Sequence, residues 1–384
     1  MSSKFAILFV AAAAALCAQE TVPGDSVKIN PVKINLPPDS PLTLISTDLG
    51  DSHVSQRGSA VVLDLDVSLT LHNSSGNRVR GVTLLVAAQE ATPGGKASVS
   101  VPSLDVAPNQ NFPVRINLRL LRPAQMGGGP LVQVNLDGVL FQDYSFYGPN
   151  RLDSRRTMTA WEMEAQRDRK YFKATLAAHG MEGLKQAVLE SLNRQAERPR
   201  LDVQVSRGRA VASAAGAERN VRFAFLRFPG EPVEPVEGWA EIAGNEARNP
   251  RIDVRNLSSQ QVRSVEIDWI VTDRQGKQYM AGSVPASGPE FNLKAGSTSR
   301  VLQDTALRLS RLANDGGAPL SIAGMMGFVG QVEFADGKVW IPNRESLAKA
   351  QLLGVLEPSP EEQRLMDLYR KKGPKALADE LGKF

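Results

Sequence analysis

FQDYSFYGPNR, at Phe141 to Arg151, and FADGKVWIPNR, at Phe334 to Arg344, are two versions of one stretch. They share Phe, Asp, Pro, Asn and Arg at matching places, and an aromatic residue recurs at Tyr147 and Trp340. The pattern predicts a strand, a turn and a second short strand, ended by Pro-Asn-Arg because proline and asparagine favour turns. The chain is therefore expected to contain one structural unit twice.

Other matches surround this stretch and keep the same order. NSSGNRVRGV, starting at Asn73, corresponds to NLSSQQVRSV, starting at Asn256, and Val101-Pro102 corresponds to Val284-Pro285 at the same spacing. The closing stretch is ten positions further apart, and a loop at residues 314–317 is predicted to hold the extra residues. Beyond it, Gly180 corresponds to Gly373 and Leu184 to Leu377. Ordered matches of this kind indicate a duplicated unit.

Apolar residues alternate with polar ones through much of each copy. In the clearest case every second residue from 61 to 71 is Val or Leu, with Asp, Ser and Thr between them. This period of two predicts a half-buried strand, and turns rich in Gly, Asn and Pro follow every eight to twelve residues or so. The fold class is therefore predicted as mostly β with helical segments. Two antiparallel immunoglobulin-like β-sandwiches are expected, each followed by a helical hairpin.

The predicted boundaries follow from changes in this pattern. A Pro-rich extended N-terminal arm is expected at residues 19–58, β-sandwich 1 at 59–157, helical hairpin 1 at 158–198 and β-sandwich 2 at 199–350. A Pro- and Glu-rich linker is predicted at 229–238, inside the second sandwich. A C-terminal helical hairpin is predicted at 358–384, where Ser359 precedes Pro360 and Glu362 as in a helix cap. Gly180 and Gly373 are the predicted breaks within the hairpins.

The N-terminal residues predict the cellular destination of the protein. Lys4 precedes an apolar run from Phe5 to Leu16, and Leu16-Cys17-Ala18 offers a small residue at a cleavage point, so residues 1–18 are predicted to be a signal peptide. The protein is expected to be exported, either periplasmic or extracellular. The alternative is a lipoprotein through Cys17, which is less favoured because Leu16 stands where such sites carry a small residue. Cleavage after Ala18 would leave no cysteine, so no disulfide is expected.

A family resemblance covers the start of the second copy. Residues 256–277, NLSSQQVRSVEIDWIVTDRQGK, resemble the strand-turn-strand signature of the immunoglobulin-like (FxLYD-like) modules of uncharacterised exported bacterial proteins. Asp273 to Gly276 supplies the Asp-x-x-Gly turn of that signature, which the first copy replaces with Gln89 to Gly95. The resemblance implies tandem immunoglobulin-like modules and does not point to any particular activity.

The sequence offers few candidates for chemistry. The three histidines are scattered without a metal-ligand spacing, there is no GxSxG motif, and the Gly-rich segment at residues 126–130 lacks the Lys-Ser or Lys-Thr of a phosphate-binding loop. We therefore predict no catalytic residues, no metal and no cofactor. A formal charge of +4, with acidic and basic residues interspersed, indicates no nucleic-acid partner. No later apolar run is long enough to predict a transmembrane span.

One basic cluster is a candidate contact for an anion or a partner, and it consists of Arg151, Arg155, Arg156, Arg167, Arg169, Lys170 and Lys173. The other interpretation is that these residues form ion pairs along a helix. Asp143 and Asp336 in the duplicated stretch also have two interpretations. They could line equivalent ligand sites, or they could accept hydrogen bonds from the amides of their own turns.

These observations favour an exported, non-catalytic interaction or scaffold protein of the bacterial cell envelope. Its partner would be an unknown protein or an anionic envelope polymer. One alternative is a carbohydrate-active or other hydrolytic enzyme with a site between domains. Another is an envelope-assembly factor that uses its N-terminal arm for strand addition.

Overall fold

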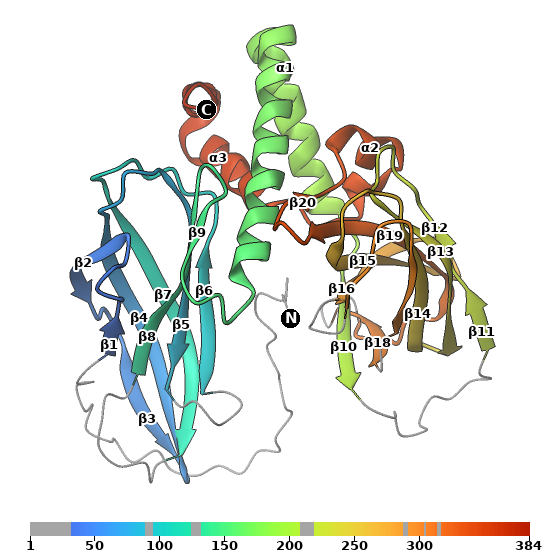
Figure 1. Cartoon of the computed structure of the whole chain (residues 1–384), viewed down its shortest axis with the longest axis horizontal. Coiled ribbons are helices and arrows are strands. Elements are labelled where there is room, and N and C mark those ends of the chain that lie inside the picture. The colour runs from blue at the N-terminus through green and yellow to red at the C-terminus, as the bar shows by residue number, and fades with distance from the viewer. Residues whose placement is uncertain are drawn as a thin grey trace. The chain divides into compact units, whose positions relative to one another are not determined.

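The computed structural model describes residues 32–88, 95–123, 132–207, 219–286, 291–302, 305–312 and 316–384. The predicted signal peptide, the start of the arm and the Gly-rich segment at 126–130 lie outside them, as do residues 314 and 315 of the predicted 314–317 loop. The chain divides into two compact units, residues 2–162 and 163–384, with the boundary inside the first long helix. The structure is mostly β with a few helices, which confirms that part of the predicted fold class (Figure 1).

The N-terminal unit contains two sheets, which we call the first β module (residues 32–147). One sheet has the order β1-β8-β5-β6, with β9 paired to β8, and its strands are β1 Val32–Asn35, β5 Val79–Ala87, β6 Lys96–Val101, β8 Val132–Phe141 and β9 Phe146–Tyr147. The other is centred on β4 (Ala60–Asn73), which pairs with β2 Leu42–Asp48, β3 His53–Arg57 and β7 Asn111–Pro123. All neighbours are antiparallel except β1 and β8.

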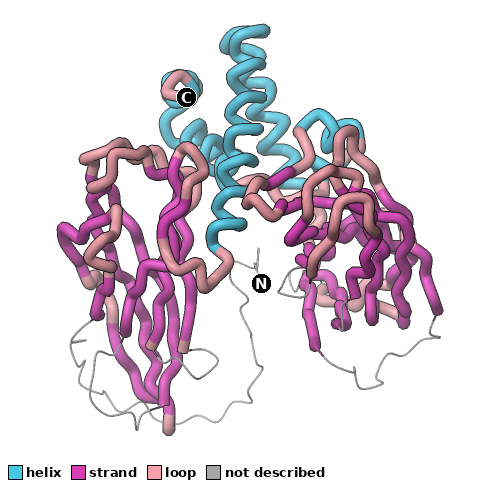
Figure 2. Tube along the Cα trace, in the orientation of Figure 1, coloured by secondary structure: helices cyan, strands magenta, loops and turns pink. Residues whose placement is uncertain are grey.

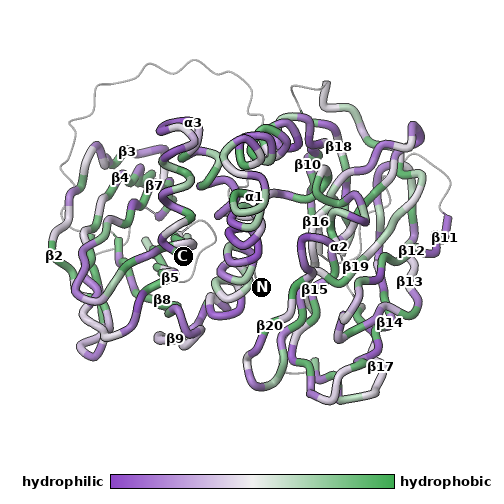
Figure 3. Tube along the Cα trace, turned by 90° about the horizontal axis from the view of Figure 1, so that it is seen from above, coloured by the Kyte–Doolittle hydropathy of each residue, from purple (hydrophilic) through white to green (hydrophobic). Residues whose placement is uncertain are grey.

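Both sheets contribute to one hydrophobic core. The predicted alternation of β4 is confirmed, because the residues of β4 at 63, 65, 67, 69 and 71 are buried and belong to this core. Facing residues come from the other sheet, among them Val82, Leu84 and Val134. Apolar and polar positions are interspersed along the chain trace (Figure 3).

The described part of the predicted N-terminal arm belongs to this module. Residues 32–35 pair with β8 in parallel, and residues 42–48 and 53–57 pair with β4. The intervening prolines, Pro37, Pro38 and Pro41, lie between strands, where the missing amide hydrogen leaves no ladder bond unmade.

The C-terminal unit contains the second β module (residues 201–340), also of two sheets (Figure 2). One has the order β10-β18-β14-β13-β11, with β17 paired to β14, and its strands are β10 Leu201–Arg207, β11 Arg219–Arg222, β13 Val233–Ala243, β14 Glu246–Asn256, β17 Thr298–Leu302 and β18 Thr305–Arg311. The other has the order β12-β19-β15-β16, with β20 paired to β19, and its strands are β12 Ala224–Phe225, β15 Val262–Asp273, β16 Gln278–Ala286, β19 Ile322–Phe334 and β20 Val339–Trp340.

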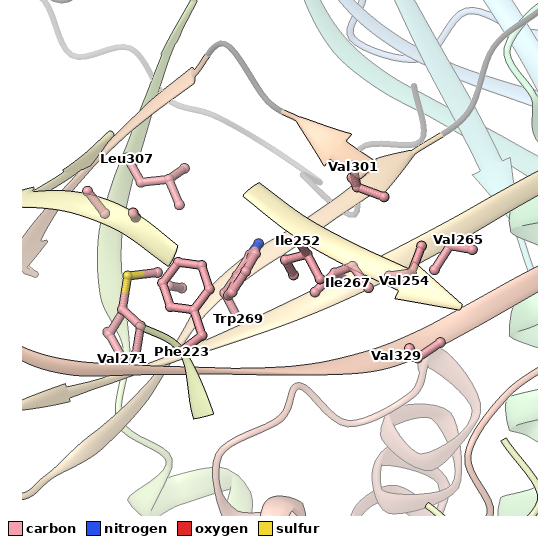
Figure 4. Close-up of a cluster of buried hydrophobic side chains, with 14 of the residues drawn as sticks. Phe223, Ile252, Val254, Val265, Ile267, Trp269, Val271, Val301, Leu307 and Val329 are labelled. Carbon is pink, nitrogen blue, oxygen red and sulfur yellow. The ribbon is translucent and has the colours of Figure 1, made fainter. Parts of the chain in front are cut away.

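The core of the second β module lies between its two sheets. Phe223 and Trp269 meet edge to face with ring centroids 4.7 Å apart, surrounded by aliphatic residues such as Ile252 and Ile267 (Figure 4). Most of the predicted 229–238 linker is part of this module, because Val233 starts β13 and is fully buried. The prolines misled the sequence interpretation; Pro235 sits beside a register shift in β13, a position that tolerates proline.

The two β modules repeat the same contacts. Asn73 and Asn256 are both fully buried, and they are the last residues of β4 and β14. The Asn73 side chain donates to the carbonyls of Asn77 and Val106 and accepts from the Ser75 amide, at 2.9, 3.3 and 3.1 Å. Asn256 makes the corresponding bonds to residues 260, 293 and 258, at 2.8, 3.1 and 2.9 Å.

The same comparison corrects one match proposed from the sequence. Val101 pairs with Val82, and the counterpart of Val82 is Val265, which pairs with Ala286. The sequence match of Val101 with Val284 is therefore two residues out of register.

The helices are α1 Ser154–Glu197, α2 Arg344–Lys349 and α3 Pro360–Leu381, with a short 3₁₀ helix, η2, at Leu352–Gly354. As predicted, Gly180 and Gly373 interrupt α1 and α3, with φ/ψ of 65°/−161° and 82°/179°. In the C-terminal unit, residues on both sides of each break form one apolar cluster, to which Phe172, Leu184 and Val188 contribute at the same spacing as Leu365, Leu377 and Leu381. Among the described residues, no helix has the length and apolar character needed to span a membrane.

Candidate functional site

A pocket of about 260 Å³ opens in the first β module, where β1 and β8 meet the segment that enters α1. Its lining residues come from the end of β1, from β5, from β8 and from the duplicated stretch, and they are Asn35, Leu36, Pro37, Leu85, Asn135, Leu136, Asp137, Pro149 and Arg151. All of them lie in the N-terminal unit. Of the basic cluster predicted from the sequence, Arg151 is the member that reaches this pocket.

Two asparagines on neighbouring strands form one polar wall. Asn35 and Asn135 are directly paired in the β1–β8 ladder, and the Asn35 side chain donates a hydrogen bond to Oδ1 of Asn135 at 2.9 Å. An amide group carries two donor hydrogens and an acceptor oxygen. This single bond therefore leaves the Nδ2 hydrogens of Asn135 and the Oδ1 atom of Asn35 as groups that a ligand can address.

The carboxylate of Asp137 holds the floor of the pocket in place. It is 1% exposed and accepts hydrogen bonds from the amides of Arg151 and Leu152, at 2.8 and 3.3 Å, and from the hydroxyl of Ser154 at 2.7 Å. Asp137 sits at a register shift of the β5–β8 ladder, which turns its side chain toward the helix entrance. Both of its oxygens are thus engaged in joining β8 to α1.

The backbone beside Arg151 adopts an unusual conformation. Asn150 has a φ of 55° and Asp153 a φ of 53°, in the left-handed region that most residues avoid. Asn150 is held there because its side chain accepts from the Arg155 amide at 2.8 Å and its own amide donates to the carbonyl of Asp137 at 3.1 Å. Its counterpart, Asn343, has a φ of −76° and caps α2 through the amide of Ser346. The entrance to α1 is therefore shaped differently from the corresponding entrance to α2.

Arg151 lines the pocket from the segment that enters α1. The residue is exposed, and within the described part of the chain no ion pair or hydrogen bond is formed by its side chain. An unpaired guanidinium offers five donors in a planar fork that matches a carboxylate or phosphate. The pocket thus combines a free cation, two amide side chains and apolar walls.

The second β module fills the equivalent space. Strand pairing aligns Asn35 with Leu226 and Asn135 with Phe328, and Pro37 aligns with Phe228. Phe228 and Phe328 pack edge to face with ring centroids 5.6 Å apart, and they join a cluster completed by Ile270, Leu347, Leu352 and Val355. Where the first module has a polar pocket, the second has an apolar core covered by α2 and η2.

Arg344, the counterpart of Arg151, makes different contacts. Arg344 is 7% exposed, and its guanidinium donates to Asp168 at 2.7 Å and to Glu362 at 3.0 and 3.3 Å. Burial by itself raises the pKa of Asp168, but Arg167, Arg344 and a hydrogen bond from Ser359 outweigh it and lower that pKa below its ordinary value. Arg344 therefore has a structural role in the C-terminal unit, which Arg151 does not share in the N-terminal unit.

The other predicted cluster residues are placed as follows. Arg155 is half-buried and Arg156 is buried, both in the N-terminal unit. In the C-terminal unit, Arg167 pairs with Asp168, Arg169 pairs with Glu361 at 3.2 Å and lies over the ring of Phe384, and Lys173 donates to a carbonyl oxygen of Phe384 at 2.7 Å. Lys170 is exposed. The cluster is thus a set of residues with separate environments.

The remaining candidates have structural roles. Asp143 accepts from the amide and hydroxyl of Ser145, at 3.0 and 2.6 Å, and Asp336 accepts from the amide of Lys338 at 3.0 Å. Both aspartates therefore cap their own turns. His72 bonds to Asn111, and in the described residues no group of three or more His, Cys, Asp or Glu side chains is arranged to hold a metal.

Sequence reasoning did not single out Asn35, Asn135 or Asp137. The two asparagines lie 100 positions apart in the chain, and only the parallel pairing of β1 with β8 brings them together. One signal was available: Asn35 and Asn135 are polar where the aligned residues of the other copy, Leu226 and Phe328, are apolar.

Comparison with known proteins adds no family. No protein family and no curated protein matches the chain. Among solved structures, a structural-genomics target named SoR45 is 16% identical over 37% of this chain and 80% of its own, with a TM-score of 0.17. A β-glucosidase from Kluyveromyces marxianus is 9% identical over 71% of this chain and 45% of its own, with a TM-score of 0.15. The structure of that enzyme with glucose is 9% identical over 79% of this chain and 48% of its own, with a TM-score of 0.16. The chain thus spans about half of the glucosidase, and likenesses this weak carry no argument.

Proposed function

We propose that this protein is an exported, non-catalytic interaction protein of the bacterial cell envelope, and that it binds a small ligand or a ligand end group in the pocket of the first β module. The observation that carries the proposal is the contrast between the two modules. At one position of the fold, Phe228 and Phe328 fill the space, whereas Asn35, Asn135 and Arg151 leave it open and polar. Pockets with apolar walls and a few placed polar groups are typical binding sites.

The architecture that we propose is a pair of immunoglobulin-like sandwiches, each followed by a helical hairpin, derived from one duplicated unit. The shared asparagine network of Asn73 and Asn256 supports this proposal, as do the matching helix breaks at Gly180 and Gly373. Sandwich folds commonly serve as binding modules, but function resides in the site rather than in the fold. Export is supported by the Lys4 to Ala18 pattern of the sequence.

A binding role suits the pocket better than a catalytic one. Its one acidic residue, Asp137, has both carboxylate oxygens engaged by two amides and a hydroxyl. A general base needs a carboxylate oxygen that can reach the substrate proton. Asp137 is instead a positioning residue that fixes the backbone of Arg151.

Thermal-shift measurements on the purified protein test the proposal. The probes are a panel of small polar compounds that includes neutral sugars, amino acids, carboxylates and inorganic phosphate. The matched variant is the double substitution Asn35→Leu/Asn135→Phe, which gives the first module the residues of the second. We expect at least one compound class to raise the melting temperature of the wild type and not of the variant. If every compound affects both proteins equally, the pocket is not the binding site.

A further inference from the structure

The second β module shows what an arginine at this position binds. Arg344 directs its guanidinium to two carboxylates, Asp168 at 2.7 Å and Glu362 at 3.0 Å. Both partners come from helices of the C-terminal unit. The arginine that follows Pro-Asn in the duplicated stretch is therefore used, in the C-terminal unit, to hold carboxylate groups.

Arg151 has no such partner in its own module. Asp137 is the acidic residue that lines the pocket. Its carboxylate oxygens accept hydrogen bonds from the backbone amides of Arg151 and Leu152 and from the Ser154 hydroxyl. Among the described residues, no carboxylate forms an ion pair with Arg151. The donors of Asn135 lie in the same pocket and are available to a second oxygen of a ligand.

The charge of the pocket selects the kind of anion. Arg151 contributes one positive charge and Asp137 contributes one negative charge to the same small space. A second negative charge on the ligand would be repelled by Asp137, so a monoanion is favoured over a phosphate, which carries between one and two charges near neutral pH. A planar carboxylate also matches the guanidinium fork.

The size and walls of the pocket limit the rest of the ligand. A volume of 260 Å³ is just below the roughly 300–1,000 Å³ of pockets that take drug-sized molecules. Leu36, Pro37, Leu85 and Leu136 supply apolar contact beside the polar groups. The space suits one sugar-sized or amino-acid-sized residue with an apolar face.

From these observations we infer that the ligand of the first β module is a carboxylate. Its oxygens are bound by the guanidinium of Arg151 and by the side-chain amide of Asn135, and its carbon skeleton lies against the four apolar residues. This inference rests on the proposed function, since it names the chemistry recognised at the same pocket.

The test uses pairs of probes of similar shape, one with a carboxylate and one neutral, titrated by calorimetry into the full chain. Propionate is compared with propionamide, and glucuronate with glucose, while inorganic phosphate serves as the probe of higher charge. The variants are Arg151→Gln and Arg151→Lys, with Arg115→Gln as the control, because Arg115 is an exposed arginine on β7 of the same module. Asn35→Leu/Asn135→Phe closes the pocket.

We expect a carboxylate to bind at least about tenfold more tightly than its neutral partner, and Arg151→Gln to abolish that preference. Arg151→Lys should keep part of it, and Arg115→Gln should keep all of it. The two acids separate a free aliphatic carboxylate from an acidic sugar as the source of the group. Binding of a neutral probe or of phosphate in preference, lost on closing the pocket, would overturn the carboxylate assignment and leave the binding site standing. Binding unaffected by closing the pocket would overturn both.

Discussion

Phe228 and Phe328 lie edge to face, with ring centroids 5.6 Å apart, where the first β module has Pro37 and Asn135, and Asn135 accepts a hydrogen bond from Asn35 there. The same fold position is therefore an apolar core in one module and an open polar pocket in the other. A packing requirement of the fold does not explain the pocket, since the second module satisfies the fold without it.

Filling the pocket is expected not to destabilise the protein. In Asn35→Leu/Asn135→Phe, one partly buried hydrogen bond is replaced by apolar contacts of the kind that the second module uses. We predict a change in the free energy of unfolding within about 1.5 kcal/mol, measured by urea denaturation. The single variant Asn135→Phe provides a comparison that keeps the Asn35 amide. A loss well beyond that range would mean that the two modules are not interchangeable at this position.

The two buried asparagines should matter equally. Asn73→Ala and Asn256→Ala each remove several hydrogen bonds from a fully buried side chain and leave carbonyls without a donor. Each substitution is predicted to lower the free energy of unfolding by roughly 1–3 kcal/mol. Asn117→Ala is the control, because Asn117 is exposed on β7. Unequal losses would argue against a shared role for the two networks.

Much of the fold could be predicted from the sequence. The alternation of β4, the Asn-containing turns and the breaks at Gly180 and Gly373 are local signals, and the structure confirms them. The register of Val284 and the burial of Val233 were missed because they depend on which strands pair. The site could be predicted only in part. Arg151 stood out by its charge, but Asn35 and Asn135 can be recognised as site residues only once the strand pairing shows that they are neighbours.

The helix breaks provide a test of backbone conformation alone. Gly180 and Gly373 have φ near 65° and 82° with extended ψ, a combination almost restricted to glycine, and an added Cβ would contact nothing at either position. Gly180→Ala and Gly373→Ala are each predicted to cost roughly 1–3 kcal/mol of unfolding free energy. Gly76→Ala, also in open space but without a positive φ, should stay within about 0.5 kcal/mol. Thermal melts of the three variants test this prediction. Equal melting temperatures would contradict a conformational requirement for glycine at the two helix breaks.

Removing one charge from the buried cluster should be costly. Asp168→Asn leaves Arg344 with one carboxylate partner instead of two, in a site where Asp168 is fully buried. We predict a loss of roughly 1.5–3 kcal/mol in the free energy of unfolding, because Arg344 loses a charge-assisted hydrogen bond at a buried site but keeps Glu362 as a partner. Glu182→Gln breaks the exposed pair with Lys185 and should cost no more than about 1 kcal/mol. Comparable losses in the two variants would contradict this view of the cluster.

The same aspartate gives a pH dependence. The pKa of Asp168 is lower in the folded protein than in the unfolded chain, so the unfolded chain binds the proton first as the pH falls. The stability contributed by Asp168 is therefore fully present above about pH 5 and declines below about pH 4, toward the folded-state pKa. Unfolding measurements between pH 7 and about pH 3 should show a shallower acid decline for Asp168→Asn than for the wild type. If stability falls equally with pH in the two proteins, Asp168 is not the cause of the acid decline.

The most direct measurement of the central claim is a nuclear magnetic resonance titration of the full chain with propionate, following side-chain amide signals. Propionate is predicted to shift the signals of Asn35 and Asn135 together, with a saturable dependence on concentration, and to leave Asn73 and Asn256 unshifted. Arg151→Gln should weaken the response about tenfold. Saturable shifts that spare Asn35 and Asn135, or no shift at any described residue of the first β module, would contradict the assignment of this pocket as a carboxylate-binding site.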